Sequence, residues 1–163
     1  VTVDRLGELA GLDVDARKNP ARGALEHLDR AGLLHEVGHD LDGTEIKQIE
    51  KINKGVEYTK RALEIIKDRY RDVDFQIGDI SRELSLNDSY LTSVFHKTTN
   101  RTPHEYLIEF RVFKSREYLE TTDLSIAEIA EKVGYKNPLS FTRIFKSKME
   151  MSPRAYVKKV KTK

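Results

Sequence analysis

The chain contains no cysteine among its 163 residues. This absence excludes disulfide bonds, zinc sites built on thiolates and cysteine nucleophiles. The sequence also has no apolar run approaching the roughly 18 residues that span a bilayer, and no secretory signal pattern opens it. We therefore expect a cytoplasmic protein with no membrane span. Because the first residue is Val1 rather than methionine, we expect a fragment or trimmed form of a longer protein.

An excess of one charge is also missing from the chain as a whole, since 29 Lys and Arg residues against 27 Asp and Glu residues give a formal net charge of +2. The balance differs between the two parts of the sequence. Residues 79–163 hold 16 basic and 11 acidic residues, a net of +5, and residues 1–78 have a net of −3. The basic excess therefore lies in the C-terminal part of the chain.

Strand-like alternation of apolar and polar residues is absent from residues 77–163, and helix signals take its place. A long helical run is predicted from Glu45 to about Tyr70, with an apolar seam of Ile49, Ile52, Val56, Leu63 and Ile66. Each shorter helix that follows has a capping side chain or an N-terminal proline. The predicted caps are Asn87 or Asp88, Thr102 before Pro103, Ser125 with Glu128, Asn137 before Pro138, and Ser152 before Pro153.

An internal repeat occupies this C-terminal part. Residues 93–107, "SVFHKTTNRTPHEYL", are echoed fifty positions later by residues 143–157, "RIFKSKMEMSPRAYV". Upstream, residues 77–86 match residues 126–135 at an offset of 49, so the second copy has one extra residue in its turn. Each copy predicts a helix-turn-helix, whose second helix enters the DNA major groove. Five aromatic side chains are predicted to lie in the core: Phe95, Tyr106, Phe141, Phe145 and Tyr156.

A helix from Pro103 to about Thr121 is predicted to connect the two copies. Its 19 residues would extend about 28 Å at roughly 1.5 Å per residue. Successive major grooves on one face of DNA are about 34 Å apart. The length therefore favours a chain that reads two successive grooves without dimerising.

Two motifs follow the pattern of a known family: "YLTSVFHKTTNRTPHEYLIEFRVFKSREYL" and "TDLSIAEIAEKVGYKNPLSFTRIFKSKMEMSPRAYV". Residues from about 57 to 160 resemble the DNA-binding domain of the AraC/XylS family of bacterial transcription regulators. The resemblance implies an all-α fold, with two helix-turn-helix subdomains joined by a long linker helix after a short helical N-terminal segment. It also implies a sequence-specific, double-stranded-DNA-binding transcription regulator, an activator with RNA polymerase as a partner, and neither enzymatic activity nor a cofactor.

We expect three parts along the chain. Residues 1–42 form an unassigned helical segment, either the remnant of a sensor or interaction domain or a winged-helix-like region. Residues 43–57 form a helical linker, and residues 58–163 form the DNA-binding domain. The family usually has glycine before each Thr/Ser-Pro pair. Asn100 tolerates the left-handed conformation required there, whereas Glu150 does not adopt it readily, which predicts strain or a reshaped turn.

The resemblance also implies which residues contact DNA. Base edges would be faced by Ser89, Thr92 and Ser93 in the first copy and by Leu139, Ser140, Thr142 and Arg143 in the second. Arg143 can form a bidentate bond with guanine, and its alternatives are a phosphate contact or an ion pair with Glu150. The short hydroxyl side chains suit thymine methyls, single hydrogen bonds or water-bridged contacts, or form an ordinary solvated face. Phosphates would be contacted by Lys97, Arg101, Thr102, Lys146, Lys148, Ser152 and Arg154.

The seam of the long helix is longer than one helix-turn-helix needs. Its C-terminal half, from about Tyr58, is predicted to pack onto the first subdomain. The N-terminal half would bury its apolar stripe against residues 1–42, and a homodimer through residues 45–66 is the alternative. Gly55 and Thr59 interrupt the seam and favour the first arrangement.

Two other readings of the sequence are open. The stretch "HEVGH", His35–His39, matches the H-E-x-x-H pattern of zinc peptidases. Gly32 and Gly38 weaken a helix there and no strong third ligand is present, so we expect no stoichiometric zinc. A helical protein-interaction module without DNA binding is the other class. Binding to bulk duplex DNA at low salt, lost as the salt concentration rises, separates it from a DNA-binding regulator.

Overall fold

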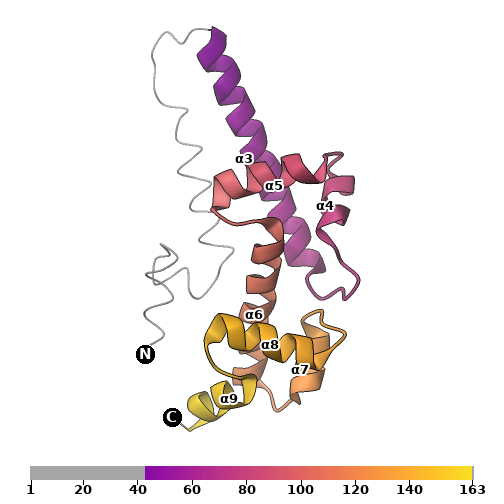
Figure 1. Cartoon of the computed structure of the whole chain (residues 1–163), viewed down its shortest axis with the longest axis vertical. Coiled ribbons are helices and arrows are strands. Elements are labelled where there is room, and N and C mark those ends of the chain that lie inside the picture. Colours follow the sequence, from indigo (N-terminus) through magenta and orange to yellow (C-terminus); the bar gives the residue numbers. More distant parts are fainter. Residues whose placement is uncertain (1–42, 163) are drawn as a thin grey trace. The chain divides into compact units, whose positions relative to one another are not determined.

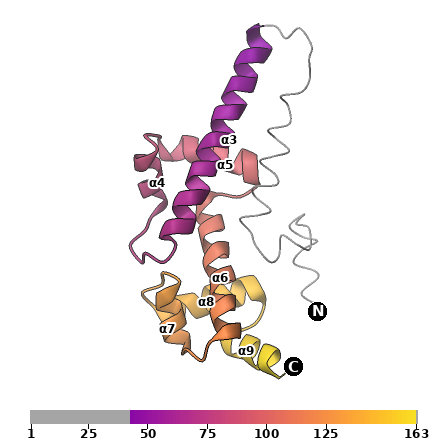
Figure 2. The same cartoon turned by 180° about the vertical axis from the view of Figure 1, so that it is seen from behind.

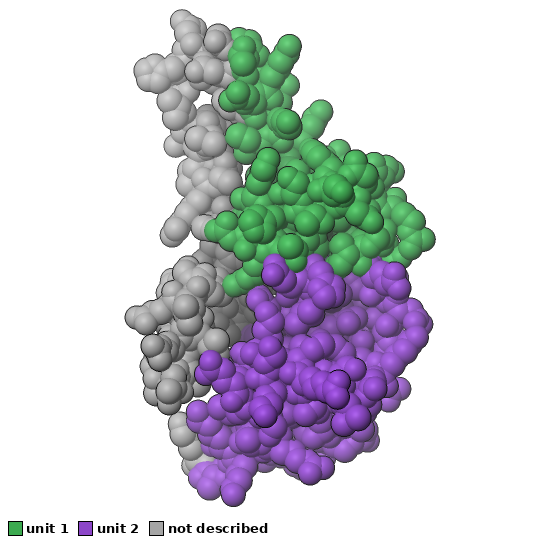
Figure 3. Space-filling view, viewed as in Figure 1, with its two compact units in different colours: residues 1–65, 77–103 green, residues 66–76, 104–163 purple. Residues whose placement is uncertain are grey.

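The computed structural model describes residues 43–162, and every regular element in that range is an α-helix. The helices are α3 (Gly43–Arg69), α4 (Ile77–Glu83), α5 (Asp88–Thr99), α6 (Pro103–Thr121), α7 (Ile126–Lys132), α8 (Pro138–Met149) and α9 (Pro153–Lys161). They divide into two compact units, coloured separately in Figure 3. Unit 1 comprises residues 43–65 and 77–103, and unit 2 comprises residues 66–76 and 104–162. The predicted all-α class is confirmed.

The internal repeat is a repeat of structure. The first helices, α4 and α7, each have 7 residues, and the second helices, α5 and α8, each have 12. The connecting turns differ by one residue, because residues 84–87 join the first pair and residues 133–137 join the second. The position of the extra residue agrees with the change of offset in the sequence, and both predicted helix-turn-helix units are present.

Within unit 1, α3 packs against α5, which crosses it in both cartoon views (Figures 1 and 2). Thr59, Ala62 and Leu63 of α3 are buried. The Thr59 hydroxyl donates a hydrogen bond to the Gly55 carbonyl (2.9 Å) and lies 3.3 Å from the Thr98 hydroxyl of α5. The predicted packing of the C-terminal half of the long helix onto the first helix-turn-helix therefore holds for residues 58–65, whereas residues 66–69 of α3 belong to unit 2.

Within unit 2, α7, α8 and α9 lie beside α6 (Figures 1 and 2). The ring centroid of Phe145 lies 5.7 Å from that of Phe141 and 5.7 Å from that of Tyr156, so a chain of aromatic contacts links α8 to α9. The Tyr156 hydroxyl donates to Glu120 and accepts a bond from Arg116 Nε (3.0 Å), both on α6. The five aromatic residues predicted to lie in the core are all buried.

The helix starts follow the local signals in the sequence. Asn87 caps α5, Asn137 caps α8 before Pro138, and Ser152 caps α9 before Pro153, each through its side-chain oxygen. Ser125 and Glu128 form a reciprocal capping box at α7. Helix α6 runs from Pro103 to Thr121, the predicted bounds.

The lysine-rich C-terminal segment is helical up to Lys161, the last residue of α9. Lys161 Nζ donates to the Thr122 carbonyl (3.2 Å) and pairs with Asp123 (2.6 Å) just after α6. These contacts keep the last turn of α9 helical.

Several predictions lie outside the residues that the structure describes. They are the helical segment over residues 1–42, including its winged-helix-like reading, and the "HEVGH" stretch. The side chain of Ile49 in the predicted seam is also outside them. Among residues 43–162, no helix combines the length and apolar character needed to cross a bilayer.

Glu150 ends α8 in the left-handed conformation, with φ 57° and ψ 10°. Asn100 ends α5 in nearly the same conformation, with φ 57° and ψ 23°. The turn of the second copy is therefore not reshaped, and Glu150 carries the strain that a Cβ has in this region. Glutamate cannot relieve this strain with the short local hydrogen bonds available to asparagine.

Replacing Glu150 with glycine is expected to raise the free energy of unfolding by about 0.5–1 kcal/mol. The left-handed conformation costs a non-glycine residue about 1–2 kcal/mol, and part of the gain is offset by the larger backbone freedom of glycine in the unfolded chain. Urea denaturation followed by circular dichroism measures the change. The matched variant Asn100→Gly should gain less, and an equal gain in both would show that Glu150 is no more strained than Asn100.

Candidate nucleic-acid interface

The second helix of the first copy, α5, has one buried and one exposed face. Leu91 and Phe95 are fully buried, whereas Ser89 and Ser93 are exposed and Thr92 is half-buried. The N-terminus of the helix is ordered by Asn87, whose side chain accepts a 2.7 Å bond from the Tyr90 amide. The three residues predicted to face bases in this copy therefore lie on a rigid, accessible face.

An open hollow follows this face of α5. It brings together five of the predicted DNA contacts of the first copy with two further side chains. The lining residues are Asp88, Ser89, Thr92, Ser93, His96, Lys97 and Thr102. Four of these side chains carry hydroxyl groups, His96 and Lys97 are basic, and Asp88 adds one carboxylate. Hydroxyl and basic groups suit a polyanion with hydrogen-bonding edges.

The second helix of the second copy, α8, repeats this division. Phe141 and Phe145 are fully buried, and Leu139, Ser140 and Arg143 are exposed. Thr142 is half-buried, like its counterpart Thr92. The sequence of burial classes over residues 141–150 is identical to that over residues 91–100. Leu139, Thr142 and Arg143 thus occupy places equivalent to those of Ser89, Thr92 and Ser93, whereas the exposed Ser140 corresponds to the half-buried Tyr90.

The two faces differ in charge. Helix α5 contains Asp88, His96 and Lys97, whereas α8 contains only basic charged residues: Arg143, Lys146 and Lys148. Lys148 pairs with Glu109 of α6 at 3.5 Å, so its charge is partly neutralised. Among the described residues, neither Arg143 nor Glu150 has a recorded ion-pair partner, and the alternative pairing of these two is not formed. The face of α8 is the more positive of the two.

The remaining predicted phosphate contacts lie around helix ends. Lys146 is exposed on α8, Arg101 and Thr102 are half-buried before α6, and Ser152 caps α9. Arg154 is exposed on α9 and lines a different hollow of unit 2, formed with residues around the end of α6 and the start of α7. The structure thus gathers all the predicted contacts of the first copy except Arg101 into one hollow and distributes those of the second.

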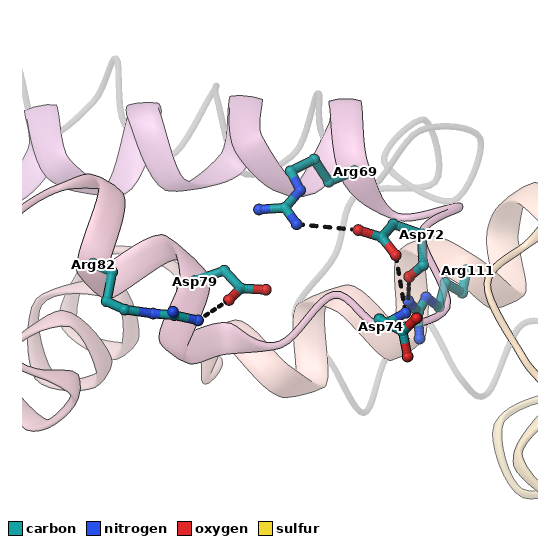
Figure 4. Close-up of polar contacts among 6 residues, drawn as sticks. All are labelled: Arg69, Asp72, Asp74, Asp79, Arg82 and Arg111. Carbon is teal, nitrogen blue, oxygen red and sulfur yellow. Dashed lines mark hydrogen bonds and ion pairs between the residues drawn. The ribbon is translucent and has the colours of Figure 1, made fainter.

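A buried arginine holds the turn that leads into α8. Arg111 of α6 donates from Nε to the Tyr70 carbonyl (2.8 Å) and from Nη2 to the Asp72 carbonyl (3.0 Å), as Figure 4 shows for Asp72. Its guanidinium also lies 5.2 Å from the ring centroid of Tyr135. Gly134, with φ 91°, is pressed against the same group. Arg111 therefore satisfies carbonyls at the end of α3 and supports the turn between α7 and α8.

Burial shifts the pKa of Arg111 and the pKa of Tyr135, whose ring lies against the guanidinium. It lowers the pKa of Arg111, and the interactions of Arg111 with Tyr135 and with the Asp72 carboxylate oppose this decrease. It raises the pKa of Tyr135, and the nearby guanidinium opposes that rise. Arginine titrates so far above neutral pH that it stays protonated. Arg111 is thus a charged donor, and the Tyr70 and Asp72 carbonyls that accept from it are neutral.

Two residues of this region were missed in the sequence. His96 is not among the predicted DNA contacts, yet it is exposed and lines the α5 hollow. The repeat could have identified it, because His96 is the counterpart of Lys146 at an offset of 50. Arg111 was overlooked because its partners lie about forty positions away.

A model of a helix-turn-helix domain family matches residues 80–159. The Msm operon regulatory protein of Streptococcus mutans is 33% identical over 116 residues, which cover 71% of this chain and 41% of that protein. The lactose operon transcription activator of Staphylococcus xylosus is 28% identical over 109 residues, covering 67% of this chain and 38% of that protein. The chain thus spans about two fifths of the length of these relatives.

A solved structure matches over nearly its full length. The C-terminal domain of the two-component response regulator yesN from Fusobacterium nucleatum superposes with a TM-score of 0.60 and 31% identity, covering 62% of this chain and 98% of that domain. The range 80–159 that the family model matches includes α5 and α7–α8, the residues whose motifs resemble the AraC pattern. The chain therefore belongs to the AraC/XylS family of transcription regulators, a class defined by DNA binding and not by catalysis.

Proposed function

We propose that the chain is a sequence-specific regulator of transcription that binds double-stranded DNA with α5 and α8 in successive major grooves. The observation that carries the proposal is the repeated division of these two helices into a buried aromatic face and an exposed polar face. Duplication of an exposed face is not needed for packing. A duplex with periodic grooves is a ligand that would use both copies.

The base contacts in this proposal are Ser89, Thr92 and Ser93 of α5 and Leu139, Ser140, Thr142 and Arg143 of α8. Phosphate contacts come from Lys97, Arg101, Thr102, Lys146, Lys148, Ser152 and Arg154. The 19-residue length of α6 supports the reading of successive grooves by one chain. Lys148 would have to exchange Glu109 for a phosphate, which makes it the weakest of these contacts.

The regulatory role is proposed from the relatives. One of them is named a transcription activator, which supports activation and RNA polymerase as a partner. A regulator of bacterial operons would act in the cytoplasm, and its family is one of DNA-binding proteins and not of enzymes. The division into residues 1–42, a linker over 43–57 and a DNA-binding domain over 58–163 also stays part of the proposal.

Helix α3 offers a surface for further association. Ile46 and Ile52 are each 46% exposed, whereas Thr59, Ala62 and Leu63 further along the helix are buried. A homodimer seam over residues 45–66 would therefore be confined to the part before Gly55, which contacts Val94. Packing of this part against residues 1–42 is the favoured arrangement, and the shortened seam is the alternative.

Replacing Arg143 with alanine is expected to weaken binding to the preferred site by about 1–3 kcal/mol and to leave binding to random duplex nearly unchanged, because a bidentate bond to guanine discriminates by that amount. The preferred site would be selected from a random duplex pool with the full chain. Fluorescence anisotropy then gives Kd for that site and for random duplex.

The matched control is Lys146→Ala, one turn further along the same helix. As a phosphate contact it should weaken both kinds of binding equally and reduce the slope of log K against log salt by about 0.9. If Arg143→Ala behaved like this control, Arg143 would be a phosphate contact. No selectable site, together with no salt-dependent binding of bulk duplex, would remove the proposed function.

A further inference from the structure

Leu139 is an unusual residue for its position. It is 68% exposed, the most exposed of the large hydrophobic side chains that the structure describes. Its place is fixed, because Pro138 occupies the first turn of α8 and the Leu139 amide donates a 2.8 Å bond to Asn137 Oδ1. Covering an apolar side chain that is otherwise exposed to water lowers the free energy of the complex.

The repeat shows that the fold does not require an apolar residue there. The counterpart of Leu139 in α5 is Ser89, which is also exposed, and residues 141–150 have the same burial classes as residues 91–100. Serine therefore satisfies the same backbone geometry and the same packing. Leu139 is thus available for a ligand and makes no contribution to the core that Ser89 lacks.

Leu139 and Arg143 are four residues apart on α8 and share its exposed face. Four residues rise about 6 Å along a helix, close to the separation of two base pairs in a duplex with about 3.4 Å per step. The only apolar group that an unmodified base presents in the major groove is the C5-methyl of thymine. An arginine beside a leucine therefore suits a guanine beside a thymine.

We infer that Leu139 is a specificity residue that covers the C5-methyl group of a thymine within about two base pairs of the guanine bound by Arg143. This assignment rests on the proposed function, since it requires α8 to lie in a major groove. Burial of one methyl group corresponds to about four-fold in affinity. The same interaction would accept 5-methylcytosine and would reject uracil and cytosine.

The test uses the full chain and the duplex selected from a random pool. Each thymine is replaced singly by deoxyuridine, which removes only the methyl group. For the unaltered chain, one substitution near the guanine should weaken binding about four-fold. For Leu139→Ala, the same substitution should have no effect, and the parent site should bind about four-fold more weakly. Because Leu139 is exposed, the variant should melt at the temperature of the unaltered chain.

A matched variant, Ser89→Ala in α5, should leave the deoxyuridine effect at that position intact. The inference is overturned if a site is selected and Arg143 is required for it, yet no deoxyuridine substitution is coupled to Leu139→Ala. That outcome leaves the proposed function standing. If the chain selects no site at all, the proposed function fails and this assignment fails with it.

Discussion

Alanine at position 134 is expected to destabilise unit 2 by about 3–5 kcal/mol, the sum of a strained backbone and an overpacked contact. Gly134 has φ 91°, where an L side chain is strained. A Cβ built there would lie 2.3 Å from the Tyr70 carbonyl oxygen and 2.7 Å from Arg111 Nη2. The carbonyl is main chain at the end of α3, so it cannot move aside as a flexible side chain would.

Thermal unfolding followed by circular dichroism measures this effect. At about 4–8 °C per kcal/mol for a unit of this size, Tm should fall by at least about 12 °C. The control is Gly78→Ala in α4, where a Cβ would meet nothing within 4 Å. That variant should be neutral or more stable by up to about 1 kcal/mol, because alanine favours a helix over glycine. If Gly134→Ala had the same Tm as Gly78→Ala, the turn would have room for a side chain.

Local signals explain why much of the fold could be predicted from the sequence. Pro103 and the Ser125–Glu128 capping box act within one helical turn, so their chemistry is visible in a short window. The repeat added a second test of each assignment, since every element had to occur twice. It located the extra turn residue in the second copy before any distance between residues was known.

The contacts of Arg111 could not be predicted in this way, because they join segments about forty residues apart. A charged residue in a helix normally indicates a solvated face. One signal was available: Arg111 lies four residues after Leu107 and four before Ser115, both buried. A charge in the middle of a buried stripe requires partners, but the stripe does not show which carbonyls they are.

The side chains that form the candidate interface could be predicted from the sequence, but the bases that they contact could not. The helical period separates Phe141 and Phe145 from Leu139 and Arg143, and the structure places the first pair in the core and the second in solvent. Which base each exposed side chain contacts depends on a duplex that the sequence does not contain. Arg101 and Lys148 illustrate a further limit, because contacts within the protein compete with DNA for them.

Replacing Arg111 with leucine is expected to destabilise unit 2 by about 3–5 kcal/mol. The guanidinium donates to the Tyr70 and Asp72 carbonyls, which follow the last residue of α3, Arg69. Carbonyls at a helix end have no partner within the helix and need one from elsewhere. A hydrogen bond from a charged donor contributes about 1.5–3 kcal/mol, and leucine supplies no donor for either carbonyl. The Asp72 carbonyl would keep its bond from the Phe75 amide (3.3 Å), so the loss falls mainly on the Tyr70 carbonyl.

Two further variants separate this mechanism from a loss of charge or volume. Arg82→Leu makes the same chemical change at a side chain that is 80% exposed, pairs with Asp79 (Figure 4) and donates to the Gly78 carbonyl (3.3 Å) within its own helix. It should cost less than about 1 kcal/mol. Arg111→Lys keeps the charge but lacks the planar fork that donates in two directions. It should therefore fall between the unaltered chain and Arg111→Leu.

Urea denaturation of the three variants measures the free energy of unfolding directly. If Arg111→Lys matched the unaltered chain, charge near the end of α3 would be sufficient and the two separate bonds would not matter. If Arg111→Leu cost no more than Arg82→Leu, the carbonyls of Tyr70 and Asp72 would have to reach water once the arginine is gone. Either result would contradict the assignment of Arg111 as the group that closes the end of α3 onto the turn before α8.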